Sequence, residues 1–142
     1  MALNFNNGGG AIKWPDRMAQ NKDFSNLVLD GFTPTDVDVA YDKRGEVFIF
    51  GELKAEGVPL PMGQRRLLMA LLQLCLASGK ECLVFVAEHN TDPSQSIDVG
   101  NLLVSQSDHT ADGAIVSGQM VGKKVAKMCS EYLDTNRDIW DK

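Results

Sequence analysis

The chain has 142 residues, of which 44% are hydrophobic and 23% are charged, and its formal net charge is −5. This length and composition predict a single domain over 1–142 with one hydrophobic core. The negative charge counts against strong electrostatic binding of nucleic acid. The stretch 1–10 lacks the features of a signal peptide and is predicted to be a flexible lead. No apolar run is long enough to cross a membrane.

The cysteines indicate the compartment. Cys75, Cys82 and Cys129 are odd in number and form no C-x-x-C pair, so neither a zinc site nor a disulfide framework is expected. Each lies in an apolar stretch, which favours buried free thiols in a reducing, cytoplasmic environment.

The first part of the chain predicts a short helix over 16–22, opened by Pro15, and a short strand at 27–29. Acidic and apolar residues alternate over 36–41, as in a strand with two different faces. A turn at 42–45 separates this segment from 46–54, which is rich in β-branched and aromatic residues. The two segments predict a β-hairpin.

After a loop, the leucine-rich stretch 62–78 predicts a helix that is buried over most of its circumference and ends at Gly79. The apolar run 81–87 predicts a buried strand that is parallel to the preceding one. Further strands are expected at 98–104 and 114–117, and an amphipathic helix at 122–133. The predicted fold class is α/β, with a mixed central sheet flanked by helices.

The hairpin carries the residues that could bind a metal ion or take part in catalysis. Glu52 and Lys54 are two apart on one strand and therefore project to the same side, and Asp38 on the neighbouring strand could meet them. Two carboxylates form a hard oxygen site that suits Mg²⁺, and the main-chain carbonyl of Leu53 is a further candidate ligand. A lysine beside such a site could position water or stabilise developing charge.

The order of these residues resembles a known family. Asp38, a glycine turn and then the string Phe-Gly-Glu-Leu-Lys that ends at Lys54 resemble the signature of PD-(D/E)XK nucleases, in which an aspartate on one strand precedes E-x-K on the next. The resemblance covers about 34–87 and includes small phage-encoded members. It implies a restriction-endonuclease-like core, with the β-hairpin as the active site.

The resemblance implies roles for several residues. Asp38 and Glu52 would bind Mg²⁺ or Mn²⁺ and Lys54 would assist catalysis, with Asp36 as the alternative aspartate. Gln64 would assist from the helix after the E-x-K strand. Arg65 and Arg66 are the candidate DNA-phosphate contacts.

At the level of function, the resemblance implies a metal-dependent nuclease that hydrolyses DNA phosphodiester bonds, as an endonuclease or an exonuclease. Structure selectivity and action as a homodimer follow by analogy alone. A phage-encoded member would act in the host cytoplasm, and no membrane partner is expected.

One element of the family pattern is missing. Many members carry a glutamate on an N-terminal helix, whereas the first glutamate here is Glu46. Asp16, Gln20 or Asp23 could substitute for the missing glutamate, with Asp16 preferred. The gap leaves open a catalytically weak or inactive relative that binds nucleic acid or a protein partner, in a phage accessory or counter-defence role. His89 and His109 lie in polar sequence and are predicted to be surface residues.

Overall fold

The computed structural model describes residues 23–142, so the predicted lead 1–10, the predicted helix 16–22 and Asp16 lie outside the described residues. The chain divides into two compact units, Met1–Pro34 and Thr35–Lys142. The described part of the first unit contains a 3-10 turn, η1, at Ser25–Leu27 and an isolated bridge between Leu29 and Phe32. The prediction of a strand at 27–29 was therefore wrong, because this short segment turns back on itself at Asp30 and Gly31, both of which have positive φ.

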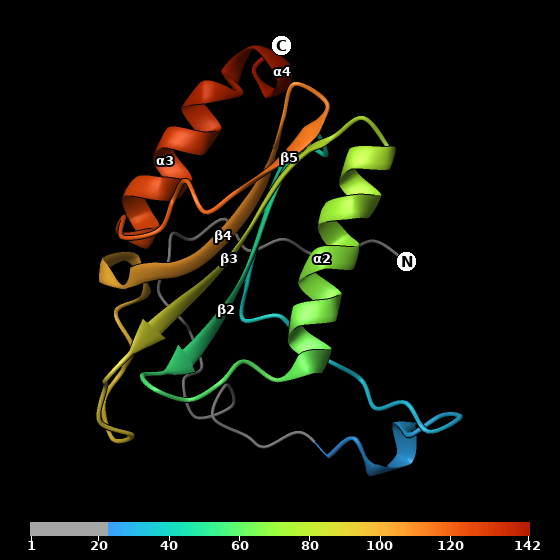
Figure 1. Cartoon of the computed structure of the whole chain (residues 1–142), viewed down its shortest axis with the longest axis vertical. Coiled ribbons are helices and arrows are strands. Elements are labelled where there is room, and N and C mark those ends of the chain that lie inside the picture. The colour runs from blue at the N-terminus through green and yellow to red at the C-terminus, as the bar shows by residue number, and fades with distance from the viewer. Residues whose placement is uncertain (1–22) are drawn as a thin grey trace. The chain divides into compact units, whose positions relative to one another are not determined.

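The second unit is a five-stranded mixed sheet flanked by helices, which confirms the α/β class (Figure 1). The strands lie side by side in chain order, and only the β2–β3 pair is parallel. The elements are β1 (Val39–Lys43), β2 (Val47–Ala55), α2 (Met62–Ala77), β3 (Glu81–His89), the 3-10 turn η2 (Val99–Asn101), β4 (Leu103–Ala111), β5 (Ala114–Ser117), α3 (Val125–Thr135) and α4 (Arg137–Trp140).

The predicted hairpin is present as the antiparallel pair β1–β2. Its turn places Arg44 and Gly45 at positive φ, and the Asp42 carboxylate accepts a hydrogen bond of 2.6 Å from the Gly45 N–H. The first strand begins at Val39 rather than at Asp36. The alternating pattern overestimated its length, because the acidic residues before Val39 lie outside the hydrogen-bonded ladder.

A helical crossover through α2 leads from β2 to its parallel neighbour β3, as predicted. Helices α2 and α3 lie on opposite sides of the sheet (Figure 1). Side chains alternate along β2, so one face packs with α3 and the other with α2. The α3-side core includes Val47, Ile49, Leu83, Phe85, Val125, Met128 and Tyr132. The α2-side core includes Leu68, Leu72, Cys82, Val84 and Val86, with Phe48 and Phe50 packed against it.

Helix α2 is less buried than predicted. Leu68 and Leu72 are its only buried residues, whereas Leu74 is 64% exposed. The abundance of leucine in 62–78 concealed an ordinary amphipathic helix, which covers the sheet with one face only.

The last two strands form a second hairpin, joined by Asp112 and Gly113, both at positive φ. Its first strand, β4, pairs with β3 with a register shift between Val86 and Ala87. The strand expected at 98–104 is mainly the turn η2, and β4 starts only at Leu103. The predicted strand 114–117 is confirmed as β5, and the predicted helix 122–133 is confirmed as α3 with slightly later bounds.

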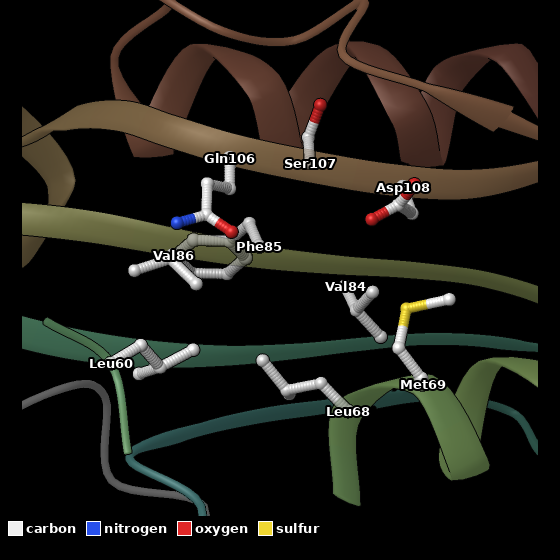
Figure 2. A pocket seen from close by; sticks show the side chains of 9 residues that line it. All are labelled: Leu60, Leu68, Met69, Val84, Phe85, Val86, Gln106, Ser107 and Asp108. Carbon is white, nitrogen blue, oxygen red and sulfur yellow. The ribbon is translucent and has the colours of Figure 1, made fainter. Parts of the chain in front are cut away.

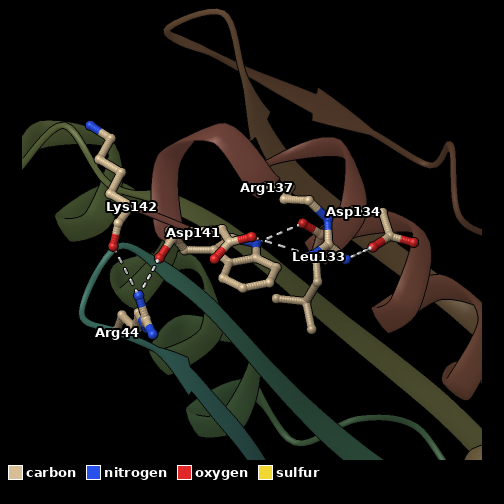
Figure 3. A network of polar contacts seen from close by, with 7 residues as sticks. Arg44, Leu133, Asp134, Arg137, Asp141 and Lys142 are labelled. Carbon is tan, nitrogen blue, oxygen red and sulfur yellow. Dashed lines mark hydrogen bonds and ion pairs between the residues drawn. The ribbon is translucent and has the colours of Figure 1, made fainter.

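The C-terminal residues contact the turn of the first hairpin (Figure 3). Arg44 Nη1 donates to the main-chain oxygens of Trp140 and Lys142, at 3.4 and 3.3 Å. The Trp140 indole N–H donates to the Leu133 carbonyl at 2.7 Å, and the Lys43 ammonium lies 4.4 Å from the centre of the Trp140 ring. Helix α4 is thereby attached both to α3 and to the end of β1.

A small hollow separates α2 from β3 and β4 (Figure 2). Leu60, Leu68, Met69, Val84 and Val86 line most of it, and its volume is about 30 Å³. This volume suits one or two water molecules, so we interpret the hollow as a packing gap at the edge of α2 rather than as a ligand site.

No helix among the described residues is long and apolar enough to cross a membrane. The three cysteines are free, as expected. Cys82 and Cys129 are buried and Cys75 is half-buried.

Gly51 is the residue of β2 that allows the closest packing. It pairs with Phe85 of β3, and a Cβ atom at position 51 would lie 2.2 Å from the Phe85 ring. We expect Gly51→Ala to lower the free energy of unfolding by roughly 1–3 kcal/mol, because the buried ring must move within a packed core. Urea denaturation of the purified protein measures this change.

Gly63→Ala is the matched control. A Cβ atom there meets only the Thr35 hydroxyl, at 3.4 Å, and alanine favours the helix. This variant should be neutral or slightly stabilising. Equal loss of stability in the two variants would contradict the packing argument.

Candidate metal-binding and catalytic site

Asp38 and Glu52 are brought together by the register of the first hairpin. Val39 pairs with Gly51, so the next residues outward on the two strands are Asp38 and Glu52. The ladder stops there, and the Asp38 Oδ2 instead accepts a hydrogen bond of 2.8 Å from the Leu53 N–H. The Asp38 side chain thus takes the place of the next backbone partner and is fixed beside β2.

The same hydrogen bond indicates the direction of the Leu53 carbonyl. On a strand, the N–H and C=O of one residue point toward the same neighbouring strand. The Leu53 N–H faces Asp38, on the side of β1, and β1 has no residue paired with Leu53. The Leu53 carbonyl therefore faces the same side as the Asp38 carboxylate.

Glu52 is a buried carboxyl group. It follows Phe48 and Phe50 on the face of β2 that packs against α2, its exposed fraction is 4%, and its Oε1 has no hydrogen-bond partner. Burial raises its pKa to about 8, with further contributions from the carboxyl of Asp38 and then from the charge of Asp36. The neighbouring aspartates thus disfavour ionisation of Glu52, and a bound cation would relieve that repulsion.

Lys54 lies on the same face as Glu52 but is held by other groups. Its Nζ is 2.6 Å from the Glu88 Oε1 and also donates, at 2.6 Å, to the Val58 carbonyl. Glu88 is the residue of β3 that pairs with Lys54 in the parallel ladder. The Lys54 side chain is only 11% exposed and that of Glu88 is 34% exposed, so the ion pair is partly shielded from water.

Sequence reasoning missed Glu88. It lies one residue beyond the apolar run 81–87 that predicted the strand. The parallel pairing of β2 and β3 was expected, but its register, which sets Glu88 beside Lys54, was not.

The helix residues are not joined to this group. Gln64 is half-buried in the first turn of α2, whereas Arg65 and Arg66 are exposed. Within residues 23–142, no hydrogen bond or ion pair connects any of them to Asp38, Glu52 or Lys54. Their predicted roles therefore depend on a bound substrate.

The histidine predictions met different outcomes. His89 is half-buried at the end of β3, where its Nδ1 accepts a hydrogen bond of 3.3 Å from the Thr91 N–H. His109 lies on β4 and is 6% exposed, so its prediction as a surface residue was wrong. The polar residues around His109 belong to a strand that is covered by α3, and their polarity hid that burial.

The donor set fits a hard divalent cation only in part. Across the described residues, no three His, Cys, Asp or Glu side chains gather closely enough to hold a metal ion. Two carboxylates and one main-chain carbonyl remain, which is the kind of incomplete set with which Mg²⁺ keeps several of its waters. The unpaired Glu52 Oε1 is the one buried oxygen of this set that lacks a partner.

Comparison of the chain with protein-family models, with curated proteins and with solved structures finds no match in any of the three.

Glu52 should make stability depend on pH when no metal is present. Its pKa is about 8 in the folded protein and about 4.5 in an exposed chain. The unfolded chain therefore loses this proton first, and stability falls as pH rises from about 4.5 to 8. Glu52→Gln removes this contribution, so in EDTA the variant should gain stability over the wild type by up to about 1.4 kcal/mol per pH unit in that window.

Denaturation curves at several pH values test this expectation. Glu56→Gln, which removes the same charge from an exposed position in the loop after β2, is the control and should follow the wild type. Parallel stability profiles for the wild type and Glu52→Gln between pH 5 and 8 would show that Glu52 is not held in a desolvated site.

Proposed function

We propose that this protein is a metal-dependent deoxyribonuclease that hydrolyses phosphodiester bonds, and that its sheet is a restriction-endonuclease-like core. The single observation that carries the proposal is the pairing of buried Glu52 with Asp38 at the point where the β1–β2 ladder ends. A buried carboxylate with an unpaired oxygen is costly. It is the kind of group that is retained where it serves a ligand.

The proposed ligands are the carboxylates of Asp38 and Glu52 and the carbonyl of Leu53. Asp36 is the alternative aspartate ligand. Bound Mg²⁺ or Mn²⁺ would supply a water of lowered pKa and would neutralise charge on the reacting phosphate. Asp38 is already fixed by the Leu53 N–H, so one ligand needs little reorganisation.

Lys54 is proposed to orient the attacking water or to stabilise the developing charge. In this structure its ammonium is bound to Glu88 and to the Val58 carbonyl. Activity therefore requires that a phosphate oxygen or water take one of these places. Gln64 would assist from the first turn of α2, and the exposed Arg65 and Arg66 would contact DNA phosphates.

The charge balance limits how DNA is held. The net charge of −5 disfavours a broad contact with the phosphate backbone. A hollow of about 390 Å³ near Lys54 includes Glu56 and Glu88 in its lining and would repel a phosphate further. Binding is proposed to depend on the metal and on a few arginines, and a structure-selective substrate or a homodimer would provide further contacts.

Cleavage assays test the proposal directly. Purified protein is incubated with linear duplex, single-stranded, flap and four-way-junction DNA in Mg²⁺, Mn²⁺ or EDTA. We expect metal-dependent cleavage that falls at least about a hundredfold in Lys54→Ala, because a group that stabilises transition-state charge is lost.

Lys127→Ala is the matched control, since it removes the same charge from an exposed position on α3. It should cleave like the wild type. Cleavage that persists in EDTA, or an equal loss in both lysine variants, would reject the proposed site.

A second candidate is a relative that binds nucleic acid or a protein without cutting. The ion pair between Lys54 and Glu88 favours it, because the ammonium that would assist catalysis already has two acceptors. In such a protein the carboxylates could still hold a cation, with no hydrolysis following.

Thermal denaturation separates these candidates. If Asp38 and Glu52 bind Mg²⁺, a tenfold excess over Kd should raise the Tm of the wild type by roughly 3–6 °C and leave that of Glu52→Gln unchanged. A raised Tm without cleavage of any DNA supports the binding-only candidate. Equal Tm values with Mg²⁺ and with EDTA would contradict a metal site in either.

A further inference from the structure

A second polar site lies on the other side of the sheet. A hollow of about 490 Å³ is bordered by the first residue of β3, the end of β4 and helix α3, with Glu81, His109, Asp112, Tyr132 and Asn136 in its lining. Glu52 and Lys54 belong to the face that packs against α2, so this hollow is separate from the proposed nuclease site. Its volume is in the range of small-molecule sites.

His109 borders this hollow and is nine-tenths buried, with an exposed fraction of 6%. Its Nδ1 has no hydrogen-bond partner. Its ring packs edge-on against Tyr132, with 5.6 Å between the ring centres. Burial lowers the pKa of His109, although the charges of Asp108 and Glu81 oppose that shift. The lowered pKa favours the neutral imidazole, in which one ring nitrogen can accept a hydrogen bond.

Three hydrogen-bond donors around the hollow are used within the protein. The Thr110 hydroxyl donates to Glu81 Oε2 at 2.6 Å, and the Tyr132 hydroxyl donates to the Thr110 carbonyl at 3.1 Å. The Asn136 amide donates to the Tyr132 carbonyl at 2.9 Å. The second Glu81 oxygen and the Asp112 carboxylate remain as charged acceptors, and the side chains of Gln119 and Thr135 can donate or accept.

The charge of the lining favours a cation. Glu81 and Asp112 contribute two carboxylates, and none of the residues that line the hollow is Lys or Arg. Asp112 is held at the rim by the tight turn with Gly113 between β4 and β5. Met120, Ile139 and Ala111 add apolar wall, which suits the carbon chain of a ligand.

We propose that this hollow binds a small organic cation through its guanidinium or alkylammonium group. Glu81 and Asp112 would accept charge-assisted hydrogen bonds from that group. His109 would accept a further one. The apolar wall would cover the attached carbon chain.

The test compares two ligands of the same shape. Binding of n-butylguanidinium and of uncharged n-butylurea is followed by amide chemical-shift changes in NMR spectra of the full chain. The charged ligand should shift the amides of 109–112 at millimolar concentration, and the neutral one should not. Equal shifts with both ligands, or none with either, would overturn the proposal.

Variants locate the site. Glu81→Gln should weaken binding of n-butylguanidinium about tenfold or more, because one charged acceptor is lost. Asp112→Asn should also weaken it and leaves the fold intact, since Asp112 is exposed and asparagine tolerates positive φ. Asp108→Asn is the matched control. The Asp108 carboxylate accepts a hydrogen bond from the Ser117 hydroxyl and borders the small hollow between α2 and the sheet instead. Equal weakening in Asp108→Asn and Asp112→Asn would show that binding depends only on the net charge of the protein, and would overturn the proposal.

A final comparison identifies the source of the cation. Tighter binding of the peptide acetyl-Gly-Arg-Gly-amide than of n-butylguanidinium would assign the hollow to an arginine side chain of a partner. Equal or weaker binding of the peptide would assign it to a free small cation. Both results support the same recognition chemistry, and neither depends on nuclease activity.

Discussion

The burial of β2 on both faces is the constraint on which the rest of the structure depends. The strand has a neighbour on each side, a helix over each face, and a glycine at position 51 because the Phe85 ring occupies the space of a side chain. Apolar residues fill both faces up to that glycine. Beyond it the strand continues with Glu52 and Lys54, and these must find partners in a nearly dry environment.

The two charged residues meet this demand differently. Lys54 has two acceptors within 2.6 Å and is satisfied by the protein alone. Glu52 has a second carboxylate as neighbour and retains an unpaired oxygen. The first arrangement is sufficient for stability, whereas the second is incomplete without a proton or a cation. This asymmetry makes Glu52, rather than Lys54, the residue that points to a ligand.

Much of this organisation could be predicted from the sequence. Alternation and turn residues identified the hairpin, and antiparallel pairing placed Asp38 beside Glu52. The apolar run 81–87 and the helix before it predicted a parallel crossover. These features are local, so periodicity and turn chemistry were enough to reveal them.

What could not be predicted depends on contacts between distant segments. Glu88 became the partner of Lys54 only through the parallel register, and the polar surroundings of His109 concealed that α3 covers β4. Helix α2 has more leucines than the sheet can cover, so periodicity alone could not say which of them would be buried. The register shift beside Val86 likewise leaves no mark in composition.

The order of the strands bears on how the chain could assemble as it is synthesised. Sheet neighbours are also neighbours in sequence, from β1 through β5. Each strand that leaves the ribosome can thus add to the growing edge, and none must be inserted between two that are already paired. One face of β2 is covered later. Its apolar residues pack against α3, which is synthesised after all five strands. Until then that face is exposed, and a nascent chain would depend on chaperones most during this interval.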